Sequence, residues 1–395
     1  MNFDLPPEIA MIRDTVHRFA VETLRPHEPL VLRREAERGF TDTPLLPPEI
    51  EAELHVKARD IGLYGIDVPE EFGGQDLGAL TKCVVIEQLK HSIVPFVAPP
   101  DSPNLHLLQS LCRGDQVERY FLPYARGEKR ASLALTEPAA GSDAGAIRTS
   151  AERRNGRWIL NGTKSFISHA RAADFLIVIA VTDPAKRNHG GMTAFLVDKD
   201  APGLSIPSIY PMIGEYCPYE VVLDNVELGD EHVLGEVGDA FGPLQRRLGL
   251  RRMEIAARCL GFAARCIEMM IEQANSRSTF GRLLADRQTI QWWIADSWQE
   301  LEMARLLTYR LATRLDRGDG DLRTEASMVK IQGTEMITRV IDRTIQAFGG
   351  MGVSKELPLE YIYRVVRVYR IVEGPSEIHR WVIARDLLKH GQPSS

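Results

Sequence analysis

Apolar residues recur at helical spacing in the first part of the chain, where Ile9, Ile12 and Val16 lie on one stripe. Between residues 131 and 238 the pattern changes to short β-branched or alternating runs such as DFLIVIAV and MTAFLVD, which are typical of strands. From Phe241 the helical spacing returns and continues through three long segments. The pattern therefore predicts an order of helices, sheet and helices.

The predicted fold class is α+β with three domains. Residues 1–130 are expected to form a helical domain, residues 131–238 an antiparallel β sheet or barrel, and residues 239–395 a helical bundle of the four-helix type. The last expectation follows because long helices joined by short loops pack as antiparallel neighbours. Asn155-Gly156 lies between two alternating runs and predicts a two-residue hairpin turn, since both residues tolerate positive φ.

The composition narrows the class of protein. The 395 residues carry 48 Lys and Arg against 54 Asp and Glu, a formal net charge of −6, which argues against a nucleic-acid-binding surface. The five cysteines are far apart and form no CxxC pair, as expected in a reducing, cytoplasmic compartment. The longest apolar run, residues 175–181, is far shorter than the ~20 residues of a membrane-spanning helix, and the first residues do not resemble a signal peptide. We expect a soluble protein.

Several common catalytic signatures are absent from the sequence. No GxGxxG follows a predicted strand, no HExxH occurs, and Gly141-Ser142-Asp143 lacks the glycine spacing of a nucleophile elbow. Lys164 in NGTKS does not follow a glycine, so a P-loop is not indicated. The ten histidines show no metal-ligand spacing, and each is expected at the surface or at a helix cap. Rossmann, hydrolase and metalloenzyme functions lose support, and no metal site is expected.

Three segments carry candidate chemistry, each with an ordinary alternative. TEPAAGSD, residues 136–143, follows a predicted strand, and its backbone N–H groups suit a polar or heteroaromatic ligand unless it is a plain turn. Glu373 follows Ile371 and Val372, so partial desolvation would make it a stronger base near neutral pH, unless it is a helix-entry carboxylate. In RSTFGRLLADRQ, arginines flank Phe280, as in a phosphate site or a solvated connector.

Together and in this order, these segments resemble the acyl-CoA dehydrogenase family over nearly the whole chain. The matching motifs are PEEFGG, LALTEPAAGSDAGAIRT with NGTKSFIS, RSTFGRLLADRQ, QAFGGMGV and VEGPSEIHR. The resemblance implies the family's three-domain fold, noncovalently bound FAD, and oxidation of the Cα–Cβ bond of an acyl-CoA thioester to the trans-2-enoyl-CoA, as in the β-oxidation of fatty acids. It also implies that the electrons pass to an electron-transfer flavoprotein.

The resemblance places a first group of residues, in the β domain, against the flavin. Thr136 would hydrogen-bond the pyrimidine side of the ring, and Ser142 would lie near both FAD and the thioester. Phe166 and Ser168 stand where the family usually has tryptophan and threonine, and they keep an aromatic face that can stack and a hydroxyl that can donate. The whole group consists of Leu133, Leu135, Thr136, Gly141, Ser142, Phe166 and Ser168.

By the same resemblance, a second group of residues would reach the FAD of a neighbouring subunit. This group consists of Arg277, Phe280, Gln288, Gln346, Gly349 and Gly350. A FAD site shared between subunits implies a homo-oligomer, either a dimer or, more commonly in the family, a tetramer built as a dimer of dimers.

Glu373 falls on the catalytic base of the family. It would remove the α-proton of the thioester, while its own backbone N–H helps to stabilise the enolate-like charge. Arg252 and Gly374 would support substrate binding. Some members place the base at the position matching Arg251, and an arginine cannot act as that base, which leaves Glu373 without a rival.

Two features depart from the usual family pattern. The family usually has a threonine and a glutamine after the base, and both hydrogen-bond FAD. This chain has Pro375 and Glu377 at these positions, so we expect those hydrogen bonds to be either lost or replaced by other contacts. The motif GPSEIH is similar to a subgroup that also occurs fused to aminoglycoside-phosphotransferase-like domains, many of which carry aspartate as the base. This part of the FAD site, and the substrate, can therefore differ from those of the enzymes that act on straight-chain fatty acyl groups.

Two other functions remain as alternatives. One is a flavin oxidase or monooxygenase on the same fold that acts on a small aromatic or nitro compound; Glu373 disfavours a monooxygenase, and an oxidase would reoxidise rapidly in air. The other is a non-catalytic helical scaffold, which would purify colourless and stay so after FAD is added. The acyl group is not identified by the sequence, and its pocket is expected to be lined from residues 92–106 and 249–253.

Overall fold

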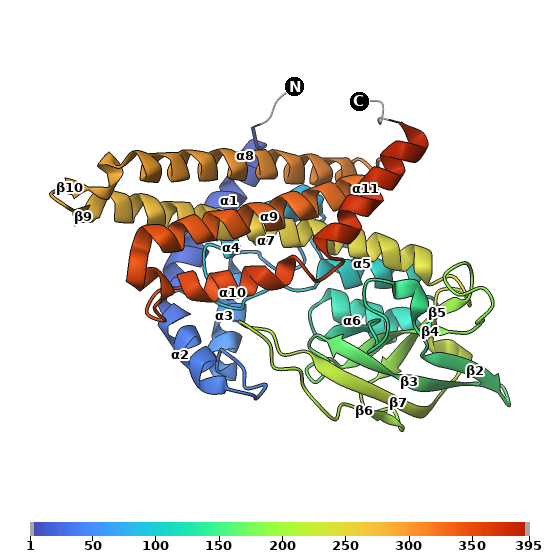
Figure 1. The fold of residues 1–395 in the computed structure, drawn as a ribbon. Coiled ribbons are helices and arrows are strands. Elements are labelled where there is room, and N and C mark those ends of the chain that lie inside the picture. The colour runs from blue at the N-terminus through green and yellow to red at the C-terminus, as the bar shows by residue number, and fades with distance from the viewer. Residues whose placement is uncertain (1–3, 392–395) are drawn as a thin grey trace.

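The computed structural model describes residues 4–391. Along the chain a helical domain is followed by a β domain and then by a bundle of long helices, so the predicted fold class is confirmed (Figure 1). The predicted domain limits at 130/131 and 238/239 stay a prediction. The helices of the first domain are α1 Pro7–Arg18, α2 Glu28–Arg38, α3 Pro48–Asp60, α4 Gly78–Leu89, α5 Ser102–Leu111 and α6 Leu122–Ala125.

The β domain of the described chain forms an eight-stranded sheet in the order β6-β7-β3-β2-β4-β5-β8, with β1 beside β4. Most pairs are antiparallel, as expected, but β1 and β2 pair with β4 in parallel, so the prediction of a wholly antiparallel sheet is wrong at these pairs. The strands are β1 Ala131–Ala134, β2 Ser150–Arg154, β3 Arg157–Ile167, β4 Phe175–Val181, β5 Met192–Asp198, β6 Leu204–Ser205, β7 Tyr219–Leu228 and β8 Val233–Leu234.

Strand β4 is apolar throughout because both faces of the sheet are covered there. Phe175, Ile177 and Ile179 face a core that includes helices α5 and α6, whereas Leu176 and Val178 face a second core within the β domain. The turn between β2 and β3 is the predicted hairpin, with φ of 50° and 77° at its two central residues. The hairpin prediction is therefore confirmed.

The three long helical segments predicted after the sheet are confirmed as α7, α8 and α9. They run side by side along the bundle, and the shorter α10 and α11 lie against it (Figure 1). A short hairpin of β9 Ser278–Thr279 and β10 Arg282–Leu283 joins α7 to α8. The helices of this part are α7 Phe241–Ser276, α8 Gln288–Asp316, α9 Arg323–Phe348, α10 Leu359–Tyr369 and α11 Ser376–His390.

Helix α7 packs tightly against both the first domain and α9. A Cβ atom built on Gly261 of α7 would lie 2.0 Å from the carbonyl oxygen of Glu87 in α4. On Gly333 of α9 it would lie 3.0 Å from the Cα of Ala256 in α7. These glycines let the helix backbones approach more closely than any side chain would allow, and they fix the position of α7, which carries several residues of the candidate site.

We expect Gly261→Ala to lower the free energy of unfolding by about 1–3 kcal/mol, because the added methyl group forces α4 and α7 apart. Gly249→Ala on the same helix is the matched control, since a Cβ there meets nothing within 4 Å. That control should be neutral or stabilising by up to about 1 kcal/mol, the gain in helix propensity. Urea denaturation of both variants checks this, and equal stability of the two would contradict the close approach.

Candidate active site

Glu373 lies in the turn between α10 and α11, and three buried side chains hold its backbone. Glu373 has φ of 56° and Gly374 has φ of 96°, two successive residues in the left-handed region. The carbonyl oxygen of Glu373 accepts hydrogen bonds from Arg252 Nε at 3.1 Å and His379 Nε2 at 3.2 Å. The carbonyl oxygen of Gly374 accepts one from Lys330 Nζ at 2.6 Å. The turn is thus clamped from α7, α9 and α11, which sustains a conformation that a non-glycine residue rarely adopts.

The protonation of the clamp follows from burial. A carbonyl oxygen only accepts, so Nε2 of His379 carries the hydrogen, and Nδ1 faces the hydroxyl of Ser327 at 3.1 Å. Burial lowers the pKa of His379 to about 3, so its ring is neutral at physiological pH. Burial also lowers the pKa of Lys330 to about 8. The expectation that each histidine lies at the surface or at a helix cap is wrong for His379, which is fully buried.

The carboxylate of Glu373 is partly buried, with 19% of its side chain exposed, and its ion-pair partner is Arg247. Arg251, Arg252 and Lys330 are further cations close enough to interact with it. The Nη1 atom of Arg247 lies 3.5 Å from Oε1 of Glu373, and its Nε donates to Oδ1 of Asn104 at 3.1 Å. Ile371 and Val372 were expected to shield the Glu373 carboxylate from water. This is wrong for Ile371, which is 56% exposed, although Val372 does pack against the core. Arg247 was not predicted as a site residue; its only signal in the sequence is the spacing of four residues to Arg251 on one helix face.

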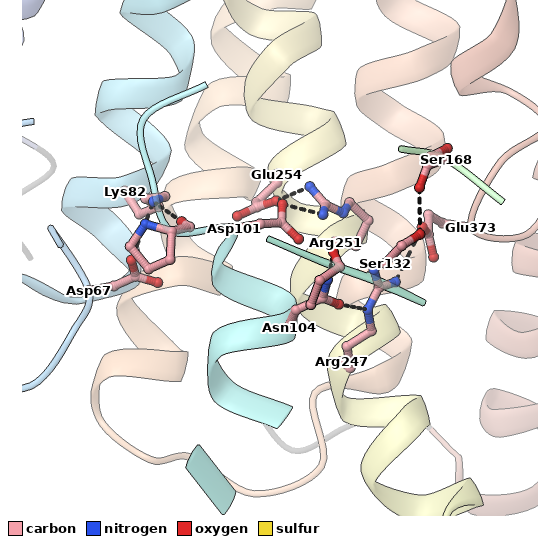
Figure 2. A network of polar contacts seen from close by, with 12 residues as sticks. Asp67, Lys82, Asp101, Asn104, Ser132, Ser168, Arg247, Arg251, Glu254 and Glu373 are labelled. Carbon is pink, nitrogen blue, oxygen red and sulfur yellow. Dashed lines mark hydrogen bonds and ion pairs between the residues drawn. The ribbon is translucent and has the colours of Figure 1, made fainter. Parts of the chain in front are cut away.

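Further buried charges continue from this point along α7 and α4. Arg251 forms ion pairs with Asp101 and, at 2.7 Å, with Glu254. Burial raises the pKa of Glu254, although Arg251 opposes this. Beyond them Lys82 lies 3.3 Å from Asp67. Figure 2 shows this polar region, from Asp67 at one end to Glu373 at the other.

A small cavity of about 20 Å³ lies among these charges, between α4 and α7. That volume suits about one water molecule. Its charged lining comes from Lys82, Lys90, Asp101, Glu254 and Arg258, and the rest of its wall is mainly apolar, from α4 and from residues 96–102. The expected lining of the acyl pocket by residues 92–106 and 249–253 stays a prediction.

The loop after β1 is held by a buried ion pair. The Glu137 carboxylate accepts hydrogen bonds from the backbone N–H groups of Arg148 and Thr149, at 2.7 and 2.9 Å, and from Lys164 Nζ at 2.8 Å. Burial lowers the pKa of Lys164 to about 8, although Glu137 opposes the shift. Lys164 also donates to the carbonyl oxygen of Leu135 at 3.0 Å. The buried side of the loop is therefore fixed by Glu137 and Lys164, and its other side faces the surface.

That free side presents the first predicted group of residues. Leu133, Leu135 and Thr136 are partly exposed, and the other members, Gly141, Ser142, Phe166 and Ser168, are exposed. Phe166 is 53% exposed and has φ of 58°, an unfavourable state for an aromatic residue. One face of its ring stacks on the ring of Tyr210, with the ring centroids 4.5 Å apart. This contact was not predicted from the sequence.

These features fit a planar heteroaromatic ligand. The outer face of the Phe166 ring is open, and a Cβ built on Gly141 would meet nothing within 4 Å, so packing inside the described chain does not require a glycine there. A bare backbone beside a half-exposed aromatic ring and the hydroxyl groups of Thr136 and Ser142 suits an isoalloxazine ring, which needs both stacking and hydrogen bonds.

The second predicted group lies at the opposite end of the bundle (Figure 1). The ends of α7 and α9 and the start of α8 pack together there through Ala274, Ala347 and Ile290. Helix α7 has 36 residues, about 54 Å, and it starts beside the β domain and ends at Ser276, directly before Arg277. The exposed members of this group are Arg277, Phe280, Gln288, Gln346, Gly349 and Gly350. One chain therefore does not bring the two groups together.

The remaining predicted residues lie beside the Glu373 turn. Pro375 precedes α11, and Glu377 in its first turn is exposed. Arg252 is buried and directed at the carbonyl oxygen of Glu373. Within residues 4–391 no group of three His, Cys, Asp or Glu is arranged to hold a metal ion.

Family models match the three parts of the chain in order. The N-terminal, middle and C-terminal domains of acyl-CoA dehydrogenase match residues 6–128, 132–226 and 241–388. A curated relative, (R)-benzylsuccinyl-CoA dehydrogenase of Thauera aromatica, is 47% identical over 100% of this chain and 99% of its own length. The chain belongs to the acyl-CoA dehydrogenase family.

Solved structures of the family superpose over the whole chain. Butyryl-CoA dehydrogenase from Megasphaera elsdenii has a TM-score of 0.86 at 28% identity, covering 98% of this chain and 100% of its own. The FAD complex of PigA has a TM-score of 0.85 at 27% identity, covering 98% and 99%. The chain is an oxidoreductase, an FAD-dependent acyl-CoA dehydrogenase. No helix within residues 4–391 is long and apolar enough to cross a membrane.

The buried, neutral His379 makes a prediction about stability and pH in this acyl-CoA dehydrogenase. In the unfolded chain its imidazole takes up a proton below its ordinary pKa of 6.5, whereas in the folded chain it stays neutral until about pH 3. Protonation therefore favours the unfolded state between these values, and stability falls as the pH falls through this window, by about 1 kcal/mol per pH unit.

His379→Gln keeps a donor for the Glu373 carbonyl but cannot titrate, so its stability should depend less steeply on pH between 6.5 and 5. His189→Gln is the control, because His189 is exposed. Chemical denaturation at pH 7.5, 6.5 and 5.5 measures the slopes. A slope in His379→Gln as steep as in the wild type would contradict a buried neutral imidazole.

Proposed function

We propose that Glu373 is the catalytic base of this acyl-CoA dehydrogenase and removes the α-proton of the thioester. The clamped turn carries this proposal, because it fixes the backbone of Glu373 while the carboxylate stays partly exposed. The backbone N–H of Glu373 has no acceptor within residues 4–391 and is free to donate to the thioester carbonyl oxygen, where charge develops. Bound FAD supplies the hydride acceptor.

The proposed FAD site consists of two groups from different subunits. Thr136 and Ser142 bind the flavin edge and Phe166 stacks on it, with Leu133, Leu135, Gly141 and Ser168 completing the surface. The group at the far end of the bundle, namely Arg277, Phe280, Gln288, Gln346, Gly349 and Gly350, would hold the rest of the FAD bound to a second copy. The separation of the groups along α7 supports a homo-oligomer, a dimer or a tetramer. Pro375 and Glu377 are further candidates for FAD contacts.

The proposed substrate is an acyl-CoA with an aromatic acyl group. The relative from Thauera aromatica acts, by its name, on a benzyl-substituted succinyl thioester. Such a substrate would place the enzyme outside the β-oxidation of straight-chain fatty acids. Arg252 and Gly374 would support its binding through the turn.

We further propose that an electron-transfer flavoprotein accepts the electrons and that the enzyme works in the cytoplasm. The likeness of GPSEIH to the subgroup fused to aminoglycoside-phosphotransferase-like domains stays a prediction.

Glu373→Gln should retain yellow FAD but reduce it about 10²–10⁴ times more slowly with an acyl-CoA substrate, because the general base is lost. Anaerobic stopped-flow bleaching of the flavin measures this rate. Glu356→Gln, which removes the same charge from an exposed position, is the control and should react like the wild type. Unchanged bleaching in Glu373→Gln would remove Glu373 from the mechanism.

Arg277→Ala should weaken FAD binding about 10–100-fold, the loss expected for a charged hydrogen bond to a phosphate. Equilibrium dialysis of FAD against the apoprotein measures the affinity, and sedimentation velocity follows the oligomer. Arg317→Ala, an exposed arginine at the other end of α8, is the control. Full FAD affinity in Arg277→Ala would argue against the proposed second half of the site.

A further inference from the structure

Arg247 is buried beside the proposed base, with 7% of its side chain exposed. Within residues 4–391 its side chain donates to the amide oxygen of Asn104, through Nε, and to the carboxylate of Glu373, through Nη1 (Figure 2). Asn104 is neutral, and the contact to Glu373 is 3.5 Å long, whereas a charge-assisted hydrogen bond is usually about 2.7–2.9 Å. The only ion pair of Arg247 within residues 4–391 is therefore a long one.

The neighbouring buried cations are paired differently. Arg251, one turn further along α7, has two carboxylate partners, Asp101 and Glu254. Lys82 has Asp67 as its partner. A buried cation without a close anion is costly, because the interior solvates it poorly. Within residues 4–391, Arg247 is the one cation of these three whose only ion pair is made with the group that must take up a proton, and Asp101, the other carboxylate near it, is paired with Arg251.

A structural role in support of Glu373 conflicts with the reaction. A general base loses its negative charge when it accepts the proton, and the guanidinium of Arg247 then loses its only ion-pair partner within residues 4–391. A second anion that engages the guanidinium would remove this conflict and would satisfy the buried charge at the same time. The anion has to arrive with the substrate, since the carboxylates nearby are already paired with Arg251 and Lys82.

We propose that Arg247 binds a second carboxylate carried by the acyl group, so that the substrate is a monothioester of a dicarboxylic acid. This inference rests on the proposed role of Glu373. The α-carbon must lie next to the Glu373 carboxylate, so a carboxymethyl substituent on it lies within reach of Arg247. Asn104 holds Nε of the guanidinium and Nη1 makes only the long contact to Glu373, while Nη2 has no acceptor within residues 4–391, so a substrate carboxylate can bind at the Nη1–Nη2 edge with two hydrogen bonds.

The test compares two substrates that differ in one group. Benzylsuccinyl-CoA is the probe with a free carboxylate, and its half-amide, with a carboxamide in place of the carboxylate, is the neutral isostere. Anaerobic flavin bleaching by the wild-type holoenzyme should favour the acid by about 100-fold in the ratio of reduction rate to Kd. Equal ratios for the two would overturn the inference. Absence of bleaching with either thioester would instead count against the proposed function.

Arg247→Gln should lose about 100-fold with the acid and little with the half-amide, and Arg247→Lys, which keeps the charge but not the fork, should fall between. Equal losses of Arg247→Gln on both substrates would assign Arg247 to Glu373 alone and overturn the inference. The Glu373→Gln variant gives a second readout, because it binds the thioester without reacting rapidly. Titrations of this variant, followed by flavin absorbance, should show tighter binding of the acid than of the half-amide. Should Arg247→Gln fail to fold, the wild-type comparison and Arg247→Lys decide.

Discussion

The candidate site depends on the hydrogen bonds that hold two consecutive carbonyl groups in the turn between α10 and α11. Arg252 and His379 bind the carbonyl oxygen of Glu373, and Lys330 binds that of Gly374. These contacts sustain two left-handed residues in sequence. A Cβ at Gly374 would lie 3.1 Å from the ring of His379, so the clamp and the glycine require each other. The proposed base is thus directed by its backbone, while its carboxylate keeps the freedom to approach a substrate.

The length of α7 imposes a second constraint on the site. This helix carries Arg247 and Arg252 near the β domain and ends beside Arg277, about 54 Å from its start. No bending of loops can bring its two ends together, so residues at both ends serve a common FAD only if two chains meet. Phe280 on the hairpin after α7 is 99% exposed, which agrees with the proposal that the far end of the bundle contacts a second subunit.

The sequence predicted those features that depend on local periodicity. The three long helices follow from apolar residues at helical spacing, and the hairpin at Asn155-Gly156 follows from the φ that these residues tolerate. The parallel pairing of β1 and β2 with β4 was not predictable in the same way, because alternation along a strand does not specify the direction of its neighbour. The direction of a neighbouring strand depends on how the whole chain is connected across the sheet.

The motifs predicted where candidate residues lie, but not what holds them. Arg247 and His379 meet at one turn from positions more than 100 residues apart, and no spacing rule connects them. Lys164, set aside as a P-loop lysine, proved to be the buried partner of Glu137 beneath the candidate flavin loop. Isolated charged residues look alike in a sequence, and burial and partners alone tell a structural ion pair from a surface charge.

If the base lies on the α10–α11 turn, as proposed for Glu373, the residues of α7 can serve other roles. Where a family member carries the base on this helix, the position cannot also carry a fixed cation. Here that position is Arg251, neutralised by Asp101 and Glu254, and one turn earlier Arg247 remains with a single distant carboxylate. Because an arginine with two close carboxylates offers less to an incoming anion than one with a single long ion pair, the face of α7 separates into a structural charge at Arg251 and, on our proposal, a charge at Arg247 that recognises the acyl group.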